Sequence, residues 1–255
     1  MGWIEAIGRG TISFVSETGR VTLTLFRAIR VAFLVPLGLR NLIKQMEQLG
    51  VNSIPVVLIT ATFTGMVLAL QSHTGFKRFN AESLVGTVVA LSMTRELGPV
   101  LTGLIVAGRA GAAMAAELGT MRVTEQIDAL ATMAVDPVKY LITPRVLAGM
   151  IMLPVLTVLA DMIGIIGGYL VSVRLLEANS GIYIRRTTQY LEVNDIMAGL
   201  MKAAIFGMLI SAVSCYKGFN AAGGAEGVGD ATTSAVVISM MLILISDYFM
   251  TAFLF

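Results

Sequence analysis

Five stretches of the sequence are long and apolar enough to cross a lipid bilayer, and this feature limits the possible folds most strongly. A membrane-spanning helix needs about 20 mostly apolar residues, and such stretches occur near 54–72, 84–112, 146–173, 196–216 and 232–254. Charged residues make up only 13% of the 255 residues, against about 25% in an average soluble protein. We therefore expect an all-α integral membrane protein whose five transmembrane helices form one domain over residues 51–255.

The second stretch is too long for a straight crossing. Its 29 residues would measure about 43 Å as an α-helix, so it must tilt, kink or project beyond the bilayer. A Gly98-Pro99 pair lies near its middle, and proline is a common cause of a helix kink.

Small residues recur at every fourth position in two of the stretches. This spacing places them along one helix face, where they allow neighbouring backbones to approach closely. We expect these faces to pack within the chain, with a contact between two copies as the alternative. The residues are Gly103, Ala107, Gly111, Ala115 and Gly119 in the second stretch, and Ala160, Gly164 and Gly168 in the third.

Residues 1–50 form a separate N-terminal region in which charge interrupts the apolar pattern. Arg20, Arg27 and Arg30 fall within an arc of about 80° on a helix, opposite Leu23 and Phe26. A cationic stripe of this kind suits an interfacial helix in the headgroup plane. The alternative is a sixth spanning helix, which would place two arginines near the middle of the membrane.

Basic residues in the flanking segments predict the orientation. With the N-terminus inside, eleven Lys and Arg residues lie on the cytoplasmic side and five on the opposite side. The positive-inside rule therefore favours a cytoplasmic N-terminus and a C-terminus on the outer side.

Composition also excludes several kinds of function. The chain has one cysteine, Cys215, and one histidine, His73, too few for a disulfide framework or a Cys/His metal cluster. The glycine-rich run Gly218–Gly229 lacks the Lys-Ser/Thr ending of a phosphate-binding loop, so any ATP must be bound and hydrolysed by a partner chain. A net charge of only +2 argues against nucleic acid as a partner. We expect no metal, no cofactor and no catalytic residues.

Four charged residues fall at membrane depth: Arg95, Glu96, Lys202 and Asp247. An unpaired charge there costs at least about 2.5–3.5 kcal/mol, so Lys202 and Asp247, at matching depth, are expected to pair, with the other two close by. Such a network can fix helix register, or it can rearrange as a cavity opens. Asp161 has no obvious partner and is expected to be neutral or hydrogen-bonded to a neighbouring helix.

The segment 117–137 is the most polar one between the spans. Its inward-facing apolar residues would leave Glu117, Arg122, Glu125 and Asp128 free to face outward. These apolar residues are Leu118, Met121, Ile127, Leu130 and Met133. We expect a short amphipathic helix that ends before Pro137 and docks into a soluble partner. The alternative is an ordinary interfacial loop helix.

Three motifs resemble those of a known family. The longest is RELGPVLTGLIVAGRAGAAMAAELGTMRVTEQIDALATMAVDPVKYLITPR at residues 95–145, followed by GFNAAGGAEGVGDATTSAVVIS at 218–239 and GMVLALQ at 65–71. Together they resemble the signature of MlaE-type permeases, the membrane subunits of ABC transporters that work with MCE proteins. The order and spacing fit from about residue 40 to the end.

The resemblance implies a homodimer that encloses a lipid cavity in a bacterial inner membrane. It implies a cytoplasmic ATPase that binds the 117–137 helix as a coupling helix, a hexameric MCE protein on the periplasmic face and phospholipid as the substrate. It also allows a STAS-domain protein as a further partner. The implied task is phospholipid movement between the inner membrane and the MCE protein, which maintains outer-membrane lipid asymmetry.

The resemblance also assigns roles to particular residues. The family's buried charges match Arg95, Glu96, Lys202 and Asp247, and a lipid cavity would be lined by residues such as Met66, Leu70, His73 and Met240. Two alternatives stay open: a secondary transporter of a hydrophobic substrate that uses Glu96 and Asp247 as proton carriers, and a membrane scaffold that anchors an MCE complex.

Overall fold

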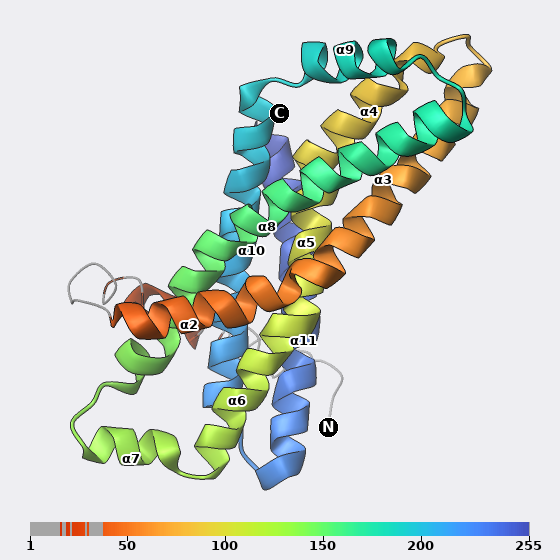
Figure 1. The fold of residues 1–255 in the computed structure, drawn as a ribbon. Helices are drawn as coiled ribbons and strands as arrows, with labels where there is room; N and C mark the ends of the chain where they lie inside the picture. The colour runs from red at the N-terminus through yellow and green to blue at the C-terminus, as the bar shows by residue number, and fades with distance from the viewer. Residues whose placement is uncertain (1–15, 17–18, 21, 29, 31–37, 255) are drawn as a thin grey trace, which may run out of the picture.

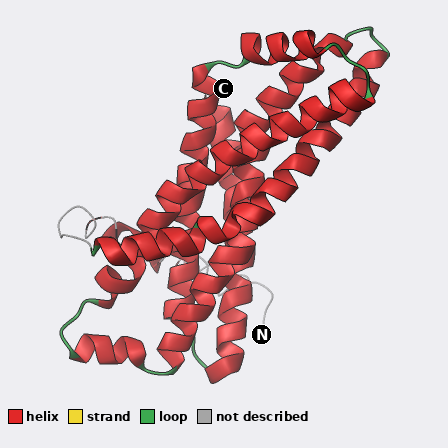
Figure 2. Cartoon of the chain, viewed as in Figure 1, coloured by secondary structure: helices red, strands yellow, loops and turns green. Residues whose placement is uncertain are grey.

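The protein is described by a computed structural model that covers residues 16, 19–20, 22–28, 30 and 38–254. These residues form helices joined by short turns, and no strand occurs among them (Figure 2). In chain order the helices are α2 (Leu39–Leu49), α3 (Ile54–Lys77), α4 (Val85–Ser92), α5 (Gly98–Val106), α6 (Ala112–Val123), α7 (Gln126–Thr132), α8 (Thr143–Leu170), α9 (Ser180–Tyr190), α10 (Val193–Phe219) and α11 (Gly224–Leu254).

Five helical runs in the described part of the chain are long and apolar enough to cross a membrane, which confirms the predicted number. They cover Leu39–Lys77, Glu82–Val123, Val138–Leu175, Val193–Phe219 and Gly224–Leu254. The second run is 42 residues long and extends to Val123. It passes well beyond the predicted end at residue 112, because no proline interrupts 112–123. Residues 22–28 of the expected interfacial helix are helical. Other parts of it lie outside the described residues, and its place at the membrane surface and the alternative sixth span both stay predictions.

The helices pack around α8, which lies between α3 and α10 (Figure 1). Glycines permit this arrangement: a Cβ on Gly65 of α3 would overlap the backbone of Gly164 on α8, and one on Gly207 of α10 would overlap Gly149 on α8. The predicted small-residue faces therefore pack within the chain. Gly103 faces Phe206 and Ile243, for example.

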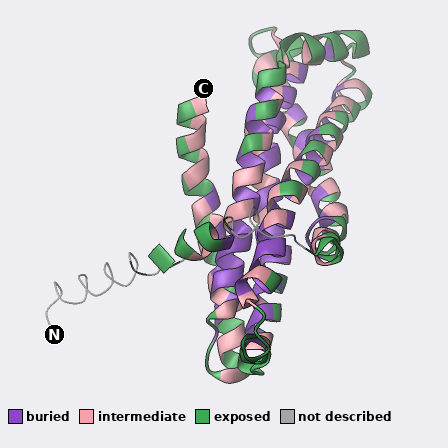
Figure 3. Ribbon diagram, turned by 90° about the vertical axis from the view of Figure 1, so that its left-hand side faces the viewer, coloured by how far each residue is buried: buried purple, intermediate pink, exposed green. Residues whose placement is uncertain are grey.

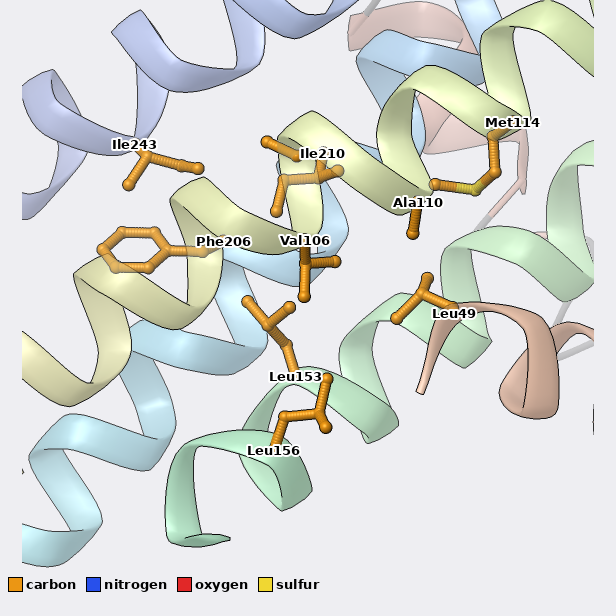
Figure 4. Close-up of a cluster of buried hydrophobic side chains, with 10 residues drawn as sticks. Leu49, Val106, Ala110, Met114, Leu153, Leu156, Phe206, Ile210 and Ile243 are labelled. Carbon is orange, nitrogen blue, oxygen red and sulfur yellow. The ribbon is translucent and has the colours of Figure 1, made fainter. Parts of the chain in front are cut away.

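The largest apolar cluster lies where α5, α6, α8, α10 and α11 meet (Figure 4). Val106, Leu153, Leu156, Phe206 and Ile210 are completely buried there. Buried residues lie in the centre of the helical bundle, and exposed residues lie on its outer faces (Figure 3). This cluster fixes the relative positions of the three helices that carry the buried charges.

The last span, α11, has the smallest buried fraction of the five helical runs in the described residues. Only Ala231, Ala235, Ser239 and Ile243 are buried along it, at intervals of four residues. From Val237 to Phe253 the exposed surface of α11 is apolar, as is one face of α3 formed by Val56, Ile59, Phe63, Val67 and Leu70. Faces of this kind suit contact with acyl chains or with a second membrane helix.

Candidate functional site

A local irregularity of the second span creates the candidate site. Residues Met93–Leu97 form a π-helical turn, closed by a hydrogen bond from the Gly98 amide to the Met93 carbonyl. Pro99 follows, and it has no N–H to donate to the carbonyl four residues before it, that of Arg95. The Lys202 ammonium on α10 donates to this carbonyl instead, at 3.0 Å. The predicted kink at Gly98-Pro99 thus takes the form of a π-turn that carries Arg95 and Glu96.

Lys202 is fully buried and lies between two carboxylates from different spans. Its Nζ is 2.8 Å from Glu96 Oε1 and 3.0 Å from Asp247 Oδ1. It also donates to the hydroxyl of Thr251 at 2.7 Å, and this hydroxyl is 3.0 Å from the same Glu96 oxygen. The expected Lys202–Asp247 ion pair is therefore present, and Glu96 shares the same lysine.

Arg95 makes its ion pair elsewhere, with a residue that sequence reasoning missed. Its Nη2 and Nε atoms lie 2.6 and 2.8 Å from one oxygen of Asp195, which is buried. The other Asp195 oxygen accepts from the Glu192 amide at 3.1 Å, in a capping box at the start of α10. Two acidic residues three positions apart, Glu192 and Asp195, precede an apolar run. This spacing could have predicted the capping box at the start of the helix.

We call these six residues the polar network: Arg95, Glu96, Asp195, Lys202, Asp247 and Thr251. They come from three spans and lie toward the end of the bundle that α9 covers (Figure 1). Burial is uneven, since Lys202 is inaccessible while the side chains of Glu96 and Arg95 are 36% and 38% exposed. The polar network therefore has a closed centre and an open edge, at which a polar group of a ligand could meet Glu96 or Arg95.

Asp161 of α8 lies close to this region without belonging to the network. Its carboxylate is buried against Gly98, where a side-chain carbon would overlap Oδ1. Oδ1 has no hydrogen-bond partner among the described residues. Of the two expectations for Asp161, the described residues therefore show no hydrogen bond from a neighbouring helix to this oxygen, and a neutral carboxyl group stays a prediction.

The segment 117–137 differs from the single helix that we expected. Residues Glu117 and Arg122 belong to α6, which ends at Val123, and α7 covers only Gln126–Thr132. The break falls at Glu125, whose backbone is left-handed with φ of 58°. The helix ends before Pro137 as expected, and Ala134, just past its end, adopts φ of 60°.

The four charged residues of this segment face outward in different ways. Glu117 is 2.9 Å from Arg145, a buried residue of α8, and Arg122 is 2.6 Å from Asp128. Glu125 is exposed at the break. Ile127 is buried as predicted, whereas Met133 is 65% exposed and does not face inward as the pattern suggested. The Arg122–Asp128 ion pair holds α7 against the end of α6.

The residues expected to line a lipid cavity are not brought together in the single chain. Leu70 lines a cavity of about 490 Å³ at the end of α3, and His73 lines a different one of about 140 Å³. Met66 lies against Gly167 of α8. Met240 of α11 packs against the main apolar cluster. The four residues share no cavity in the single chain, and a lipid cavity enclosed by two copies stays a prediction.

The described residues offer no cluster of the kind that binds a metal ion. They contain no group of three or more His, Cys, Asp or Glu side chains that could hold a metal ion. Cys215 is buried. The arrangement of the polar network therefore suits ion pairing between helices and contact with a polar ligand.

Comparison with known proteins shows what the chain is similar to. A family model described as "Permease MlaE" matches residues 42–253. A probable ABC transporter permease protein of Rickettsia felis is 53% identical over 98% of this chain and 97% of its own length. The intermembrane phospholipid transport system permease protein MlaE of Haemophilus influenzae is 39% identical over 100% and 98%. The chloroplastic protein TRIGALACTOSYLDIACYLGLYCEROL 1 of Arabidopsis thaliana is 42% identical over 85% of this chain and 62% of its own length.

Proposed function

The chain belongs to the MlaE permease family, and on that premise we propose that it is the membrane subunit of an ABC transporter for phospholipids. In this proposal two copies form the membrane unit in a bacterial inner membrane, with the N-terminus in the cytoplasm and the C-terminus in the periplasm. A separate cytoplasmic ATPase supplies the energy, with a STAS-domain protein as a further partner of the ATPase. A periplasmic MCE protein exchanges lipid with the permease.

The observation that carries the proposal is the polar network with its open edge. A phospholipid has a charged headgroup and apolar tails, so its site needs polar side chains beside a long apolar surface. Glu96 and Arg95 are partly exposed at membrane depth. The open apolar faces of α3 and α11 supply surface for acyl chains.

A change in the shape of the cavity would move the lipid. In the proposed mechanism the ATPase closes on ATP, and the lipid cavity of the dimer changes from open to collapsed. A ligand leaves a site when the site binds it less well in one state than in the other. Glu96 and Asp247 share one lysine, so either carboxylate can keep that lysine paired while the other moves with its helix.

The ATPase would bind at α7 and the adjoining end of α6. These elements lie at the end of the bundle opposite α9 (Figure 1). The exposed carboxylates of Glu125 and Asp128 offer acidic contacts. The Arg122–Asp128 and Glu117–Arg145 ion pairs connect this surface to the second and third spans.

The test is ATP-dependent lipid transfer by the chain reconstituted in liposomes with its ATPase and an MCE acceptor. We expect transfer of fluorescent phospholipid that stops without ATP. Glu125→Lys with Asp128→Lys should abolish both ATPase binding and transfer, whereas the exposed Asp230→Lys on α11 should change neither.

Two outcomes would overturn the proposal. Lipid movement driven by a pH gradient without ATP would assign Glu96 and Asp247 to proton transport. If the chain assembles normally with the MCE protein but moves no lipid with ATP or with a pH gradient, it would be a membrane scaffold.

A further inference from the structure

A second polar site lies at the other end of the spans, between the N-terminal helical segment and the body of the protein. It is a cavity of about 450 Å³, comparable to the sites that hold small ligands. Arg20, Leu23, Thr24 and Arg27 form one wall, and the end of α10 with the turn before α8 forms the other. The lining includes Arg20, Leu23, Arg27, Asp136, Ile142 and Phe219.

The walls of this cavity are fixed parts of the fold. Ala28, at the end of the N-terminal segment, is 1% exposed and packs with Leu118, Ile127 and Val146. The hydroxyl of Thr143 lies 3.5 Å from the Ala28 carbonyl. The N-terminal segment is therefore anchored to the start of α8.

The charge of the cavity is positive. Arg27 is 3.0 Å from Asp136, and this pair is half-exposed. Arg20 donates to the neutral hydroxyl of Ser16 at 3.1 Å. The lining thus contains two guanidinium groups and one carboxylate, while Leu23, Ile142 and Phe219 supply apolar surface.

The cavity lies at one end of the spans. Ile142 directly precedes α8, and Phe219 is the last residue of α10. Along α10, Phe219 is 17 residues beyond Lys202, or roughly 26 Å. The cavity is therefore separate from the polar network and lies near the opposite membrane surface.

We propose that this cavity binds the phosphate headgroup of an anionic phospholipid from the bilayer leaflet on the α7 side. The guanidinium groups of Arg20 and Arg27 would bind the phosphate oxygens, since arginine suits phosphate geometry. The first methylene groups of an acyl chain would lie on Leu23, Ile142 and Phe219. This lipid is a bound structural ligand, and the inference does not depend on what the protein transports.

Native mass spectrometry of the purified, delipidated chain in detergent tests this proposal. The probes are phosphatidylglycerol, phosphatidylcholine and inorganic phosphate, each titrated separately. We expect tighter binding of phosphatidylglycerol than of phosphatidylcholine. The variant Arg20→Gln with Arg27→Gln should weaken phosphatidylglycerol binding at least about tenfold, because each arginine contributes about 1 kcal/mol near an anionic lipid surface.

A matched control uses Arg30→Gln with Arg40→Gln, which removes the same charge from two exposed residues outside the cavity. This control should retain the affinity. A second variant, Asp136→Asn, keeps an oxygen for the Val138 amide but removes the negative charge. It should therefore tighten phosphatidylglycerol binding about fivefold.

Three results would overturn the proposal. One is an equal loss of affinity in the cavity variant and the control, which would indicate a general charge effect. Another is unchanged affinity in Asp136→Asn, which does not depend on whether the double variant folds. The third is full competition by inorganic phosphate at millimolar concentration, which would indicate a site for the free ion.

Discussion

Arg109, on the second span, donates a 2.9 Å hydrogen bond from Nε to the hydroxyl of Ser53, at the joint between α2 and α3. Its Nη2 also donates to the carbonyl oxygens of Gln48 and Leu49, at 2.5 and 3.2 Å. These carbonyls belong to the last turn of α2, where an α-helix has no amides of its own to satisfy them. Hydrogen bonds from the second span thus stabilise the joint between α2 and α3 in the first helical run.

The joint between α2 and α3 should loosen when this guanidinium is removed. We expect Arg109→Met to raise hydrogen exchange of the amides in 48–54 about tenfold, because hydrogen bonds to a charged group contribute roughly 1.5–3 kcal/mol. Exchange mass spectrometry in detergent measures this. Arg40→Met, at an exposed position of α2, should leave exchange at the joint unchanged, and equal effects of the two variants would contradict the assignment.

The buried lysine should be required for stability only while its carboxylates are present. Lys202→Met leaves Glu96 and Asp247 without their shared cation, and breaking a buried pair costs about 3–5 kcal/mol. A large fall in the thermal midpoint is expected. The triple variant with Glu96→Gln and Asp247→Asn should recover most of that midpoint while ATP-dependent lipid transfer stays lost. Recovery of transfer as well would show that the polar network only sets helix register.

The Arg95–Asp195 pair should show energetic coupling across two spans. A double-mutant cycle with Arg95→Met and Asp195→Asn is expected to give an interaction energy of about 1–3 kcal/mol, measured by reversible unfolding in mixed micelles. Asparagine can still accept the Glu192 amide, so the helix cap is retained. Additive effects of the two substitutions would mean that the ion pair contributes nothing to stability.

Glycine-to-alanine substitution should have opposite effects at two kinds of helical position. Within α3, Gly65→Ala would overlap the backbone of Gly164, while a Cβ at Gly75 meets open space. Alanine normally stabilises a helix interior by about 1 kcal/mol relative to glycine, so Gly75→Ala should raise the thermal midpoint. Gly65→Ala should lower it, since overpacking costs about 1–3 kcal/mol. A rise in both variants would refute the close α3–α8 contact.

Sequence periodicity and hydropathy predict this fold well because the membrane limits the choices. In a bilayer, a run of about 20 apolar residues can form all its backbone hydrogen bonds only as a helix. The five spans can therefore be predicted without tertiary information. The small-residue faces can be predicted once the spans are known to be helices. Their helical spacing places Gly103 and Gly164 on packing faces without any knowledge of the partner helix.

The candidate site could be predicted only in part. The Lys202–Asp247 pair follows from opposite charges at matching depth. The partner of Arg95 could not be predicted in this way. Asp195 lies at the boundary of a span, where charged residues are common and do not indicate a buried ion pair. The break at Glu125 was missed as well, since a left-handed non-glycine residue leaves no periodic signal. Apolar pattern alone also could not show that Met133 faces outward.

The shared use of Lys202 has a consequence for the order in which the chain is assembled in the membrane. Glu96 precedes Lys202 in the chain and Asp247 follows it. When α10 enters the bilayer during synthesis, its lysine already has a carboxylate to meet, so the nascent four-span intermediate can retain this helix. The helix α11 then arrives with a carboxylate and only a narrow strip of buried residues for packing. Lys202 is thus the attachment point that recruits the last helix to a bundle already formed without it.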